Sequence, residues 1–420
     1  MNKHAQTLQG FDPRRLQRMD EAIARNYVET GAIPGALTMV WRKGELVWRS
    51  TSGMIDLGRG LPVREDSIFR LYSMTKPITA VALLMLMEEG QIGLDDPVSR
   101  YIPGFANLGL YAGGVLGAFL SAPNIKPMKV VDLLRHTSGL TYGFLNRTNL
   151  DAAYRKLKIS EADEEGGLAG MIAALEKLPL EFVPGETWNY SVGLDVAGWL
   201  VEKISGQRFG DFLRTRILTP LQMHDTDFQV PASKRDRFAT CYYVRDGKLL
   251  VFDDAQNSTY AQPPQLESGG GGLAGTAKDY MRFSRMLLNG GELEGARLLS
   301  PKTVALMTMN HLPGGRTMTE MMPVTGAFNE SGYAGVGYGL GVAVTENVAA
   351  TGLPGTAGEY SWGGAAGTYF FNDPKEDLAV VFMTQVLFAP DRIKIRRDLR
   401  TLVYGAMTES YMRAGAGASA

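Results

Sequence analysis

Hydrophobic residues recur at helix and strand spacing along most of the chain, and this pattern predicts its elements. Apolar positions three or four apart predict an amphipathic helix over residues 13–30. Two runs rich in β-branched and aromatic residues, 36–41 and 46–50, predict a hairpin. Residues 78–87 are apolar on nearly every helical face, which is typical of a buried helix. The chain therefore opens with a helix, a strand pair and a second, buried helix.

The middle of the chain has the pattern of a helical insertion. Glycines interrupt residues 105–122, which we expect to form a loop or a broken helix. Apolar residues at helical spacing then predict five helices, over residues 129–136, 151–157, 167–178, 191–205 and 209–217. We therefore predict a mostly helical domain over residues 96–265.

The last third returns to a mixed pattern. It predicts helices over residues 276–288, 300–309 and 392–407, and strands over 338–344, 367–371 and 378–385. Because strands lie near both ends of the chain, we expect one sheet assembled from both termini. Residues 1–95 and 266–420 would then form a single α/β domain around the helical one.

Composition narrows the class of protein. The 420 residues carry a net charge of −1 and are 45% hydrophobic, an ordinary balance for a soluble globular protein. No polybasic run suggests nucleic acid or an anionic membrane as a partner. Cys241 is the single cysteine, and residues 1–15 lack the apolar core of a secretory signal. No apolar run is long enough to span a membrane, so we expect a cytoplasmic protein.

A serine and a lysine three residues apart mark the start of the buried helix. Ser73-Met74-Thr75-Lys76 is the only Ser-x-x-Lys in the chain, and a short predicted strand precedes it. On a helix, positions three apart share a face, so the Lys76 amine would lie beside the Ser73 hydroxyl. Backbone N–H groups at a helix start also favour a nearby oxyanion. The pair therefore indicates a serine nucleophile that works without histidine.

Tyr190 is a second candidate. It follows a turn-rich segment and stands immediately before the predicted helix at residues 191–205. A phenol has an ordinary pKa near 10, so it needs a nearby cation to act as a base at neutral pH. Lys76 could be that cation.

Paired glycines beside a predicted strand form the third candidate element. In Ser361-Trp362-Gly363-Gly364-Ala365 the glycines allow a ligand or another backbone to approach closely. Their N–H groups could provide a second oxyanion donor opposite the amide of Ser73.

Other catalytic chemistries have less support in the sequence. No Gly-x-Ser-x-Gly elbow is present, which argues against an α/β-hydrolase. His136, His224 and His311, with His4 near the N-terminus, show no close ligand spacing, so we expect no metal and no other cofactor. His136 ends a predicted helix, where we expect it to cap or pack rather than react.

The three motifs together resemble the penicillin-recognising serine hydrolases, and most closely their family VIII carboxylesterases, the esterase branch similar to class C β-lactamases. Ser73-Met74-Thr75-Lys76, Tyr190-Ser191-Val192 and Trp362-Gly363-Gly364 stand in that family's order and approximate spacing. Segments 133–140 and 270–273 resemble further parts of the superfamily, and the resemblance extends from about residue 16 to residue 411. It implies an α+β fold of β-lactamase type, an antiparallel sheet flanked by helices with an inserted helical domain.

Two departures from the β-lactamases bear on the substrate. Val192 stands where they carry asparagine, and Trp362-Gly363-Gly364 replaces their Lys-Thr-Gly. The lost polar groups help to orient the carboxylate and amide of a β-lactam, so the apolar replacements favour neutral esters. By this resemblance Val192, Trp362, Gly363 and Gly364 would bind substrate.

The resemblance implies a serine carboxylesterase for short-chain acyl esters, with weak cephalosporin hydrolysis. Ser73 would be the nucleophile, Lys76 and Tyr190 the proton-transfer unit, and the amides of Ser73 and Ala365 the oxyanion hole. The partner would be a small ester molecule. Three alternatives stay open: a class C-like β-lactamase, a D-amino-acid peptidase, or a non-catalytic binding or sensor protein on the same fold. The sequence leaves the general base, the natural substrate, the enantioselectivity and the oligomeric state undetermined.

Overall fold

An eight-stranded antiparallel sheet forms the centre of the computed structural model, which describes residues 8–161, 166–322 and 334–411. The strand order is β12-β13-β14-β15-β16-β1-β2-β3. The strands are β1 (Gly35–Arg42), β2 (Glu45–Asp56), β3 (Leu61–Pro62), β12 (Val336–Tyr338), β13 (Ala343–Thr345), β14 (Tyr360–Gly363), β15 (Tyr369–Asp373) and β16 (Leu378–Met383). Because β1 pairs with β16, with Leu37 opposite Met383, the sheet joins both ends of the chain, as predicted.

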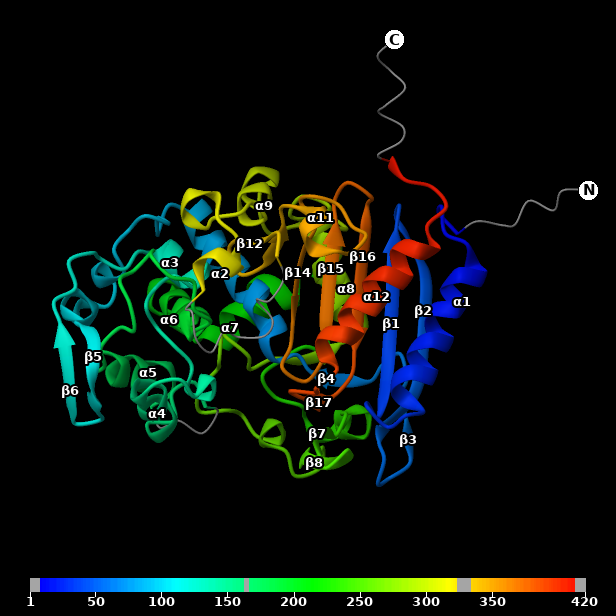
Figure 1. The fold of residues 1–420 in the computed structure, drawn as a ribbon, viewed down its shortest axis with the longest axis horizontal. Coiled ribbons are helices and arrows are strands. Elements are labelled where there is room, and N and C mark those ends of the chain that lie inside the picture. Colours follow the sequence, from blue (N-terminus) through cyan, green and yellow to red (C-terminus); the bar gives the residue numbers. More distant parts are fainter. Residues whose placement is uncertain (1–7, 162–165, 323–333, 412–420) are drawn as a thin grey trace, which may run out of the picture.

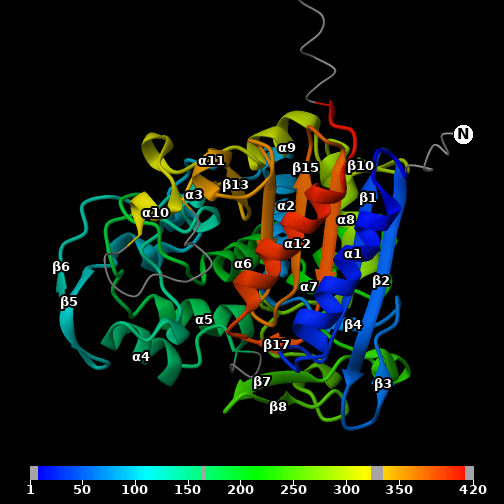
Figure 2. The ribbon, with the colours of Figure 1, turned by 45° about the vertical axis from the view of Figure 1, so that its right-hand side comes forward.

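Helices cover both faces of this sheet (Figures 1 and 2). On one face lie α1 (Pro13–Ile23), which continues as a π-helical turn to Val28, and α12 (Arg392–Ala406). On the other lies α8 (Ala277–Leu288), where Tyr280 packs 5.0 Å from Phe370 of β15. Every residue of β16 is buried, as expected for a strand covered on both faces. These elements confirm the α+β, β-lactamase-like fold.

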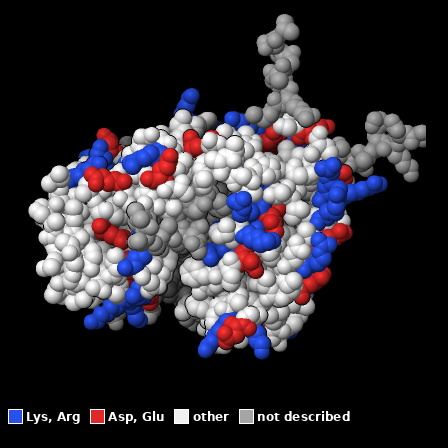
Figure 3. Space-filling model, in the orientation of Figure 1, with Lys and Arg blue, Asp and Glu red and all other residues white. Residues whose placement is uncertain are grey.

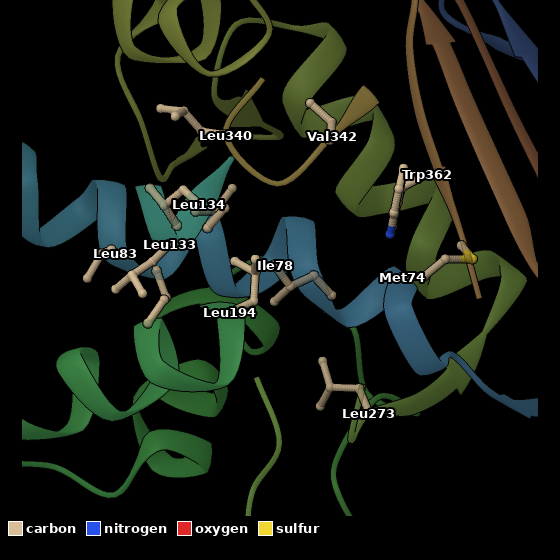
Figure 4. Close-up of a cluster of buried hydrophobic side chains, with 14 of the residues drawn as sticks. Met74, Ile78, Leu83, Leu133, Leu134, Leu194, Leu273, Leu340, Val342 and Trp362 are labelled. Atoms are coloured by element: carbon tan, nitrogen blue, oxygen red, sulfur yellow. The ribbon is translucent and has the colours of Figure 1, made fainter. Parts of the chain in front are cut away.

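The predicted buried helix is α2 (Thr75–Glu88). All its residues from Thr75 to Leu86 are buried. Figure 4 shows its side chains Ile78 and Leu83 among leucines from α3 (Val130–Leu134) and α6 (Gly193–Ser205). The helix that begins beside Ser73 is therefore fixed along its length by apolar packing.

The middle of the chain holds strands as well as the predicted helices. The other helices are α4 (Asn149–Lys156), α5 (Gly167–Leu175) and α7 (Phe209–Leu213). A hairpin of β5 (Leu110–Val115) and β6 (Ala118–Ala122) occupies residues predicted to be a loop or broken helix. That prediction was wrong because Gly117, at φ +91°, makes the hairpin turn, and Gly114, at φ +87°, lies within β5, where a Cβ would be 2.2 Å from the Ala118 carbonyl oxygen.

A second hairpin in the middle of the chain pairs with its end. β7 (Cys241–Arg245) and β8 (Lys248–Asp253) are antiparallel, and β7 pairs in parallel with β17 (Val386–Leu387). The division of the chain at residues 95 and 265 stays a prediction.

One predicted strand is in fact two. Residues 338–344 contain the end of β12, a turn, and the start of β13. The turn is made by Gly339, where a Cβ would lie 2.4 Å from a backbone oxygen, and by Gly341 at φ +85°. The remaining elements are β4 (Ile68–Arg70), β9 (Ala274–Thr276), β10 (Glu292–Leu293), β11 (Ala296–Arg297), α9 (Pro301–Met307), α10 (Met318–Met321) and α11 (Val348–Thr351). Within the described ranges, no helix combines the length and the apolarity needed to cross a bilayer.

Candidate active site

Ser73 lies in a single 3₁₀ turn, Tyr72–Met74, between β4 and α2. Tyr72 has a φ of +45°, a left-handed conformation that costs a non-glycine residue free energy and is common at functional sites. The surrounding structure holds the turn. The Leu71 N–H donates to the Leu273 carbonyl at 2.9 Å, and the Tyr280 hydroxyl donates to the Met74 carbonyl at 3.0 Å. The strand, turn and helix predicted around Ser73 are therefore present.

The Lys76 side chain is buried beside Ser73. Its Nζ donates to Ser73 Oγ at 3.2 Å and to the Gly270 carbonyl at 2.6 Å. The same Nζ lies over the rings of Tyr190 at 4.5 Å and Tyr142 at 5.2 Å, within cation–π range. Only 1% of the lysine is exposed, so these contacts take the place of water around its amine.

Tyr190 completes the set of groups at Ser73. Its hydroxyl donates to Ser73 Oγ at 2.6 Å, although the two residues are 117 positions apart in the chain. The structure thus brings both Lys76 and Tyr190 within hydrogen-bond reach of Ser73. A nucleophile with a base in contact is the arrangement that acyl transfer requires. Their roles in a reaction stay predictions.

His136 supports Tyr190 from behind. Its carbonyl accepts the Asn189 N–H at 2.9 Å, and its Nδ1 accepts the Ser191 N–H at 3.3 Å. The imidazole packs against the Tyr190 ring with centroids 4.8 Å apart. Burial, followed by the charge of Lys76, holds the pKa of His136 well below its ordinary value. The residue therefore stays neutral and holds both neighbours of Tyr190, a position consistent with packing rather than reaction.

Asp195 and Tyr142 were not singled out in the sequence, and Gly270 was quoted only as part of a segment that resembles the superfamily. The fully buried Asp195 carboxylate accepts the Gly270 N–H at 3.0 Å and a hydrogen bond from Ser268. It thereby holds Gly270, the residue whose carbonyl accepts a hydrogen bond from Lys76. Burial, followed by the charge of Asp195, raises the pKa of Tyr142 well above 10, so the phenol keeps its proton. Asp195 could have been found from the sequence, because it is an aspartate on the apolar face of the helix that follows Tyr190.

The paired glycines allow two backbones to pass at close range. A Cβ on Gly364 would lie 2.5 Å from the Leu71 carbonyl, and one on Gly363 would lie 2.3 Å from the Arg396 guanidinium. Neither position can carry a side chain without displacing its neighbour. This close passage brings Ala365 into the wall of the same cleft as Ser73. An oxyanion hole formed by the Ser73 and Ala365 amides stays a prediction.

Trp362 and Val192 lie away from the cleft surface. Trp362 is 3% exposed and packs against Tyr190 and Tyr338, with ring centroids 5.6 and 5.1 Å apart. Val192 is fully buried at the start of α6. Figure 4 shows Trp362 above the start of α2, close to Met74. These positions give no support to direct substrate contact, because β14 turns the tryptophan toward the core.

Ser73 and Tyr190 open into one cleft of about 690 Å³. Its lining is largely aromatic and apolar, and comprises Tyr72, Ser73, Tyr142, Phe144, Ser160, Glu161, Tyr190, Phe228, Phe252, Asp253, Thr259, Tyr260, Pro264, Leu266, Ser268, Gly270, Gly271, Gly272, Ala365, Leu387 and Phe388. The ring centroids of Phe144 and Phe388, which both line the cleft, lie 5.7 Å apart. His224 and His311 are absent from this lining.

The cleft offers carbon surface rather than charge. Figure 3 shows Lys, Arg, Asp and Glu scattered over one face of the molecule without a large patch of one sign. Among the described residues, no group of three or more His, Cys, Asp or Glu side chains is placed to hold a metal ion. The aromatic and apolar part of the lining is typical of a site for an organic molecule.

The chain matches known proteins over nearly its whole length. The family model described as Beta-lactamase matches residues 21–404. Protein Rv1367c of Mycobacterium tuberculosis is 34% identical over 369 residues, 87% of this chain and 89% of that protein. Esterase EstB of Burkholderia gladioli is 30% identical over 413 residues, 94% of this chain and 96% of that protein.

A solved structure agrees with these sequence relatives. The structure of EstCE1, described as a hydrolase with promiscuous acyltransferase activity, superimposes with a TM-score of 0.78 at 26% identity. The match covers 93% of this chain and 99% of EstCE1. The resemblance predicted from the three motifs is confirmed. The chain belongs to the beta-lactamase family and is a serine hydrolase of that superfamily, with esterases among its relatives.

Proposed function

We propose that the protein is a carboxylesterase of family VIII type that hydrolyses neutral short-chain acyl esters through an acyl-enzyme on Ser73. The observation that carries this proposal is the contact of Ser73 Oγ with Tyr190 Oη at 2.6 Å and Lys76 Nζ at 3.2 Å, within an apolar cleft. The esterase relative EstB supports the same assignment.

In the proposed reaction, Ser73 Oγ attacks the ester carbonyl while its proton passes to the Lys76–Tyr190 unit. The tetrahedral oxyanion is held by the amides of Ser73 and Ala365. Tyr190 then returns the proton to the leaving alcohol, and the C–O bond to that alcohol breaks. Water, activated by the same unit, attacks the acyl-enzyme and releases the acid. Because the Lys76 amine lies 4.5 Å from the centre of the Tyr190 ring and both groups contact Ser73 Oγ, we assign the base to the pair.

Steady-state kinetics on a chain-length series of p-nitrophenyl esters tests this function. We expect turnover of acetyl and butyryl esters, slow hydrolysis of the cephalosporin nitrocefin, and no release of D-alanine from a D-alanyl-D-alanine peptide. Nitrocefin hydrolysis as fast as butyrate hydrolysis would make the protein a β-lactamase, and D-alanine release a peptidase. A stoichiometric burst without turnover would make it a non-catalytic binding protein.

Acyl transfer to an alcohol is a second candidate function. Much of the cleft lining is apolar, which favours an organic acceptor over water. EstCE1 is described as a hydrolase with acyltransferase activity. Adding an alcohol to the butyrate assay and measuring butyrate ester against free butyrate separates the two reactions, since transfer makes ester at the expense of acid.

A further inference from the structure

Part of the wall of the Ser73 cleft is built by side chains from residues 228–266, a later part of the chain. We call it the side chamber and define it by Phe228, Phe252, Thr259, Tyr260 and Leu266, all of which line the cleft. The Tyr260 hydroxyl donates to the carbonyl of Gly271 at 3.5 Å. This hydrogen bond joins the side chamber to the glycine-rich loop. In that loop the carbonyl of the preceding residue, Gly270, accepts a hydrogen bond from Lys76.

The cleft is too large for a small ester alone. Its volume is about 690 Å³. Methyl butyrate has seven heavy atoms and, at roughly 30 Å³ for each, fills roughly a third of that space. Binding sites of this size commonly enclose most of a drug-sized ligand. A short ester would leave the side chamber to water, and its aromatic surface would gain nothing from binding.

The charges around the side chamber exclude an anion. Among the described residues that line the cleft none is lysine or arginine, and the carboxylates are those of Glu161 and Asp253. Asp253 is paired with the buried Arg70 at 2.6 Å and accepts the Ser258 hydroxyl at 2.7 Å. An anionic group would lose its hydration here without gaining a cation. An uncharged ring would instead exchange water for carbon contacts.

We propose that the side chamber binds a bulky, uncharged, ring-bearing group of the ester substrate. The aromatic side chains of Phe228, Phe252 and Tyr260 suit a ring system better than a flexible chain, because aromatic pairs gain from offset or edge contacts. The inference rests on the proposed esterase function. The ring-bearing group belongs either to the alcohol part or to the acid part of the ester, and the side chamber would bind it by the same apolar contacts in both cases.

Two substrate pairs test the inference and show whether the ring-bearing group belongs to the alcohol part or to the acid part of the ester. The alcohol arm compares ethyl acetate with naphthylethyl acetate, both esters of primary alcohols. The acid arm compares ethyl acetate with ethyl naphthylacetate. In at least one arm, kcat/KM by pH-stat should be about ten-fold higher for the naphthyl ester. A carboxylate on that naphthyl ring should remove the gain.

Variants on exposed positions connect the gain to the side chamber. Phe252 is 54% exposed on β8, so Phe252→Ala should fold and should lower the naphthyl-to-ethyl ratio about three-fold or more. Thr259→Trp fills the chamber from an exposed position and should lower the same ratio. The matched control is Val251→Ala. Val251 precedes Phe252, is 56% exposed and does not line the cleft, so the ratio should not change.

The outcomes separate this inference from the function on which it rests. Equal kcat/KM for all three esters, or a ratio that neither Phe252→Ala nor Thr259→Trp lowers, would overturn the side chamber as a ring-binding site. In both cases Ser73→Ala must still abolish hydrolysis. If Ser73→Ala hydrolysed ethyl acetate at the wild-type rate, the proposed function itself would fail.

Discussion

The floor of the cleft and its walls differ in how their side chains are held. On the floor, Lys76 and Tyr190 are 1% and 2% exposed and both bind Ser73. On the walls, Phe144, Phe252 and Phe388 are 40%, 54% and 42% exposed. The floor side chains have one arrangement available, whereas the wall side chains can adjust to a ligand. We therefore expect substitutions on the floor to lower the rate for every ester, and substitutions on the walls to change which ester is preferred.

The strongest test of the floor is removal of its nucleophile. Ser73→Ala should lower kcat/KM for p-nitrophenyl butyrate on the order of 10⁴-fold or more, because no neighbouring group replaces the serine oxygen. The thermal unfolding midpoint should change little, since the substitution removes one hydroxyl from the cleft. Labelling of the wild-type protein with a serine-reactive phosphonate, followed by peptide mapping, should place the adduct on Ser73. An adduct on another serine would contradict the assignment.

The second test asks whether the floor acts as one unit. Lys76→Ala and Tyr190→Phe should each lower kcat/KM by about as much as both together, because each removes the same proton path. A double-mutant cycle on kcat/KM for the butyrate measures the coupling. Strictly additive losses would mean that the lysine and the tyrosine serve separate steps.

The floor was more accessible to sequence reasoning than the walls. Ser73, Lys76 and Tyr190 stand in short local patterns, a helix start and a loop-to-helix junction, and local patterns survive folding. Phe252 of β8 and Phe388, which follows β17, come from distant segments that the pairing of β7 with β8 and β17 brings together. No local spacing encodes that pairing, so the walls could not be predicted.

The same distinction explains the errors in the predicted fold. The uniformly apolar α2 and the periodic α12 were predicted within a few residues, and β1 and β16 paired as a sheet from both termini requires. The hairpin β5–β6 was missed because its glycines also suit a loop. The substrate contact predicted for Trp362 by analogy with a lysine is not an error of fold and stays a prediction, and its side chain is 3% exposed.

The third test concerns the support beneath Lys76. Asp195→Asn keeps an oxygen acceptor but removes the negative charge of the carboxylate. That carboxylate accepts hydrogen bonds from Gly270 and Ser268. A positioning role predicts that kcat falls about ten-fold or more while KM is unchanged, and that the loss disappears in a Lys76→Ala background. Asp211→Asn is the control, since that carboxylate is 55% exposed in a surface ion pair. Equal losses with and without Lys76 would indicate a general effect on the fold.

The fourth test concerns His136, which holds both neighbours of Tyr190. His136→Asn suits the left-handed φ of +58° and offers an oxygen in place of Nδ1, so we expect kcat to fall only about three- to ten-fold. His311→Asn is the matched control, because that histidine lies outside the cleft lining. A loss as deep as that of Ser73→Ala, in a folded variant, would place the imidazole in the reaction itself.

His136 also predicts a pH dependence of stability. Burial, followed by the charge of Lys76, keeps its pKa well below 6.5 in the folded protein. The unfolded chain binds a proton at this residue below about pH 6.5, whereas the folded protein does not, so acid lowers stability by up to about 1.4 kcal/mol per pH unit. Urea unfolding at several pH values should show a smaller loss in His136→Asn. Equal slopes for the two proteins would mean that the imidazole is charged when folded.

The smallest expected effect is at Trp362, between floor and walls. Its ring packs against Tyr190 at 5.6 Å but does not line the cleft. Trp362→Phe should therefore lower kcat for p-nitrophenyl butyrate and nitrocefin together, and leave their kcat/KM ratio within about two-fold. Trp362→Lys would bury an ammonium in the core, so it should lower the urea midpoint before it changes specificity. A ratio that shifted toward nitrocefin in a stable Trp362→Lys variant would show that residue 362 faces the substrate. The wall aromatics would then share control of specificity with this strand.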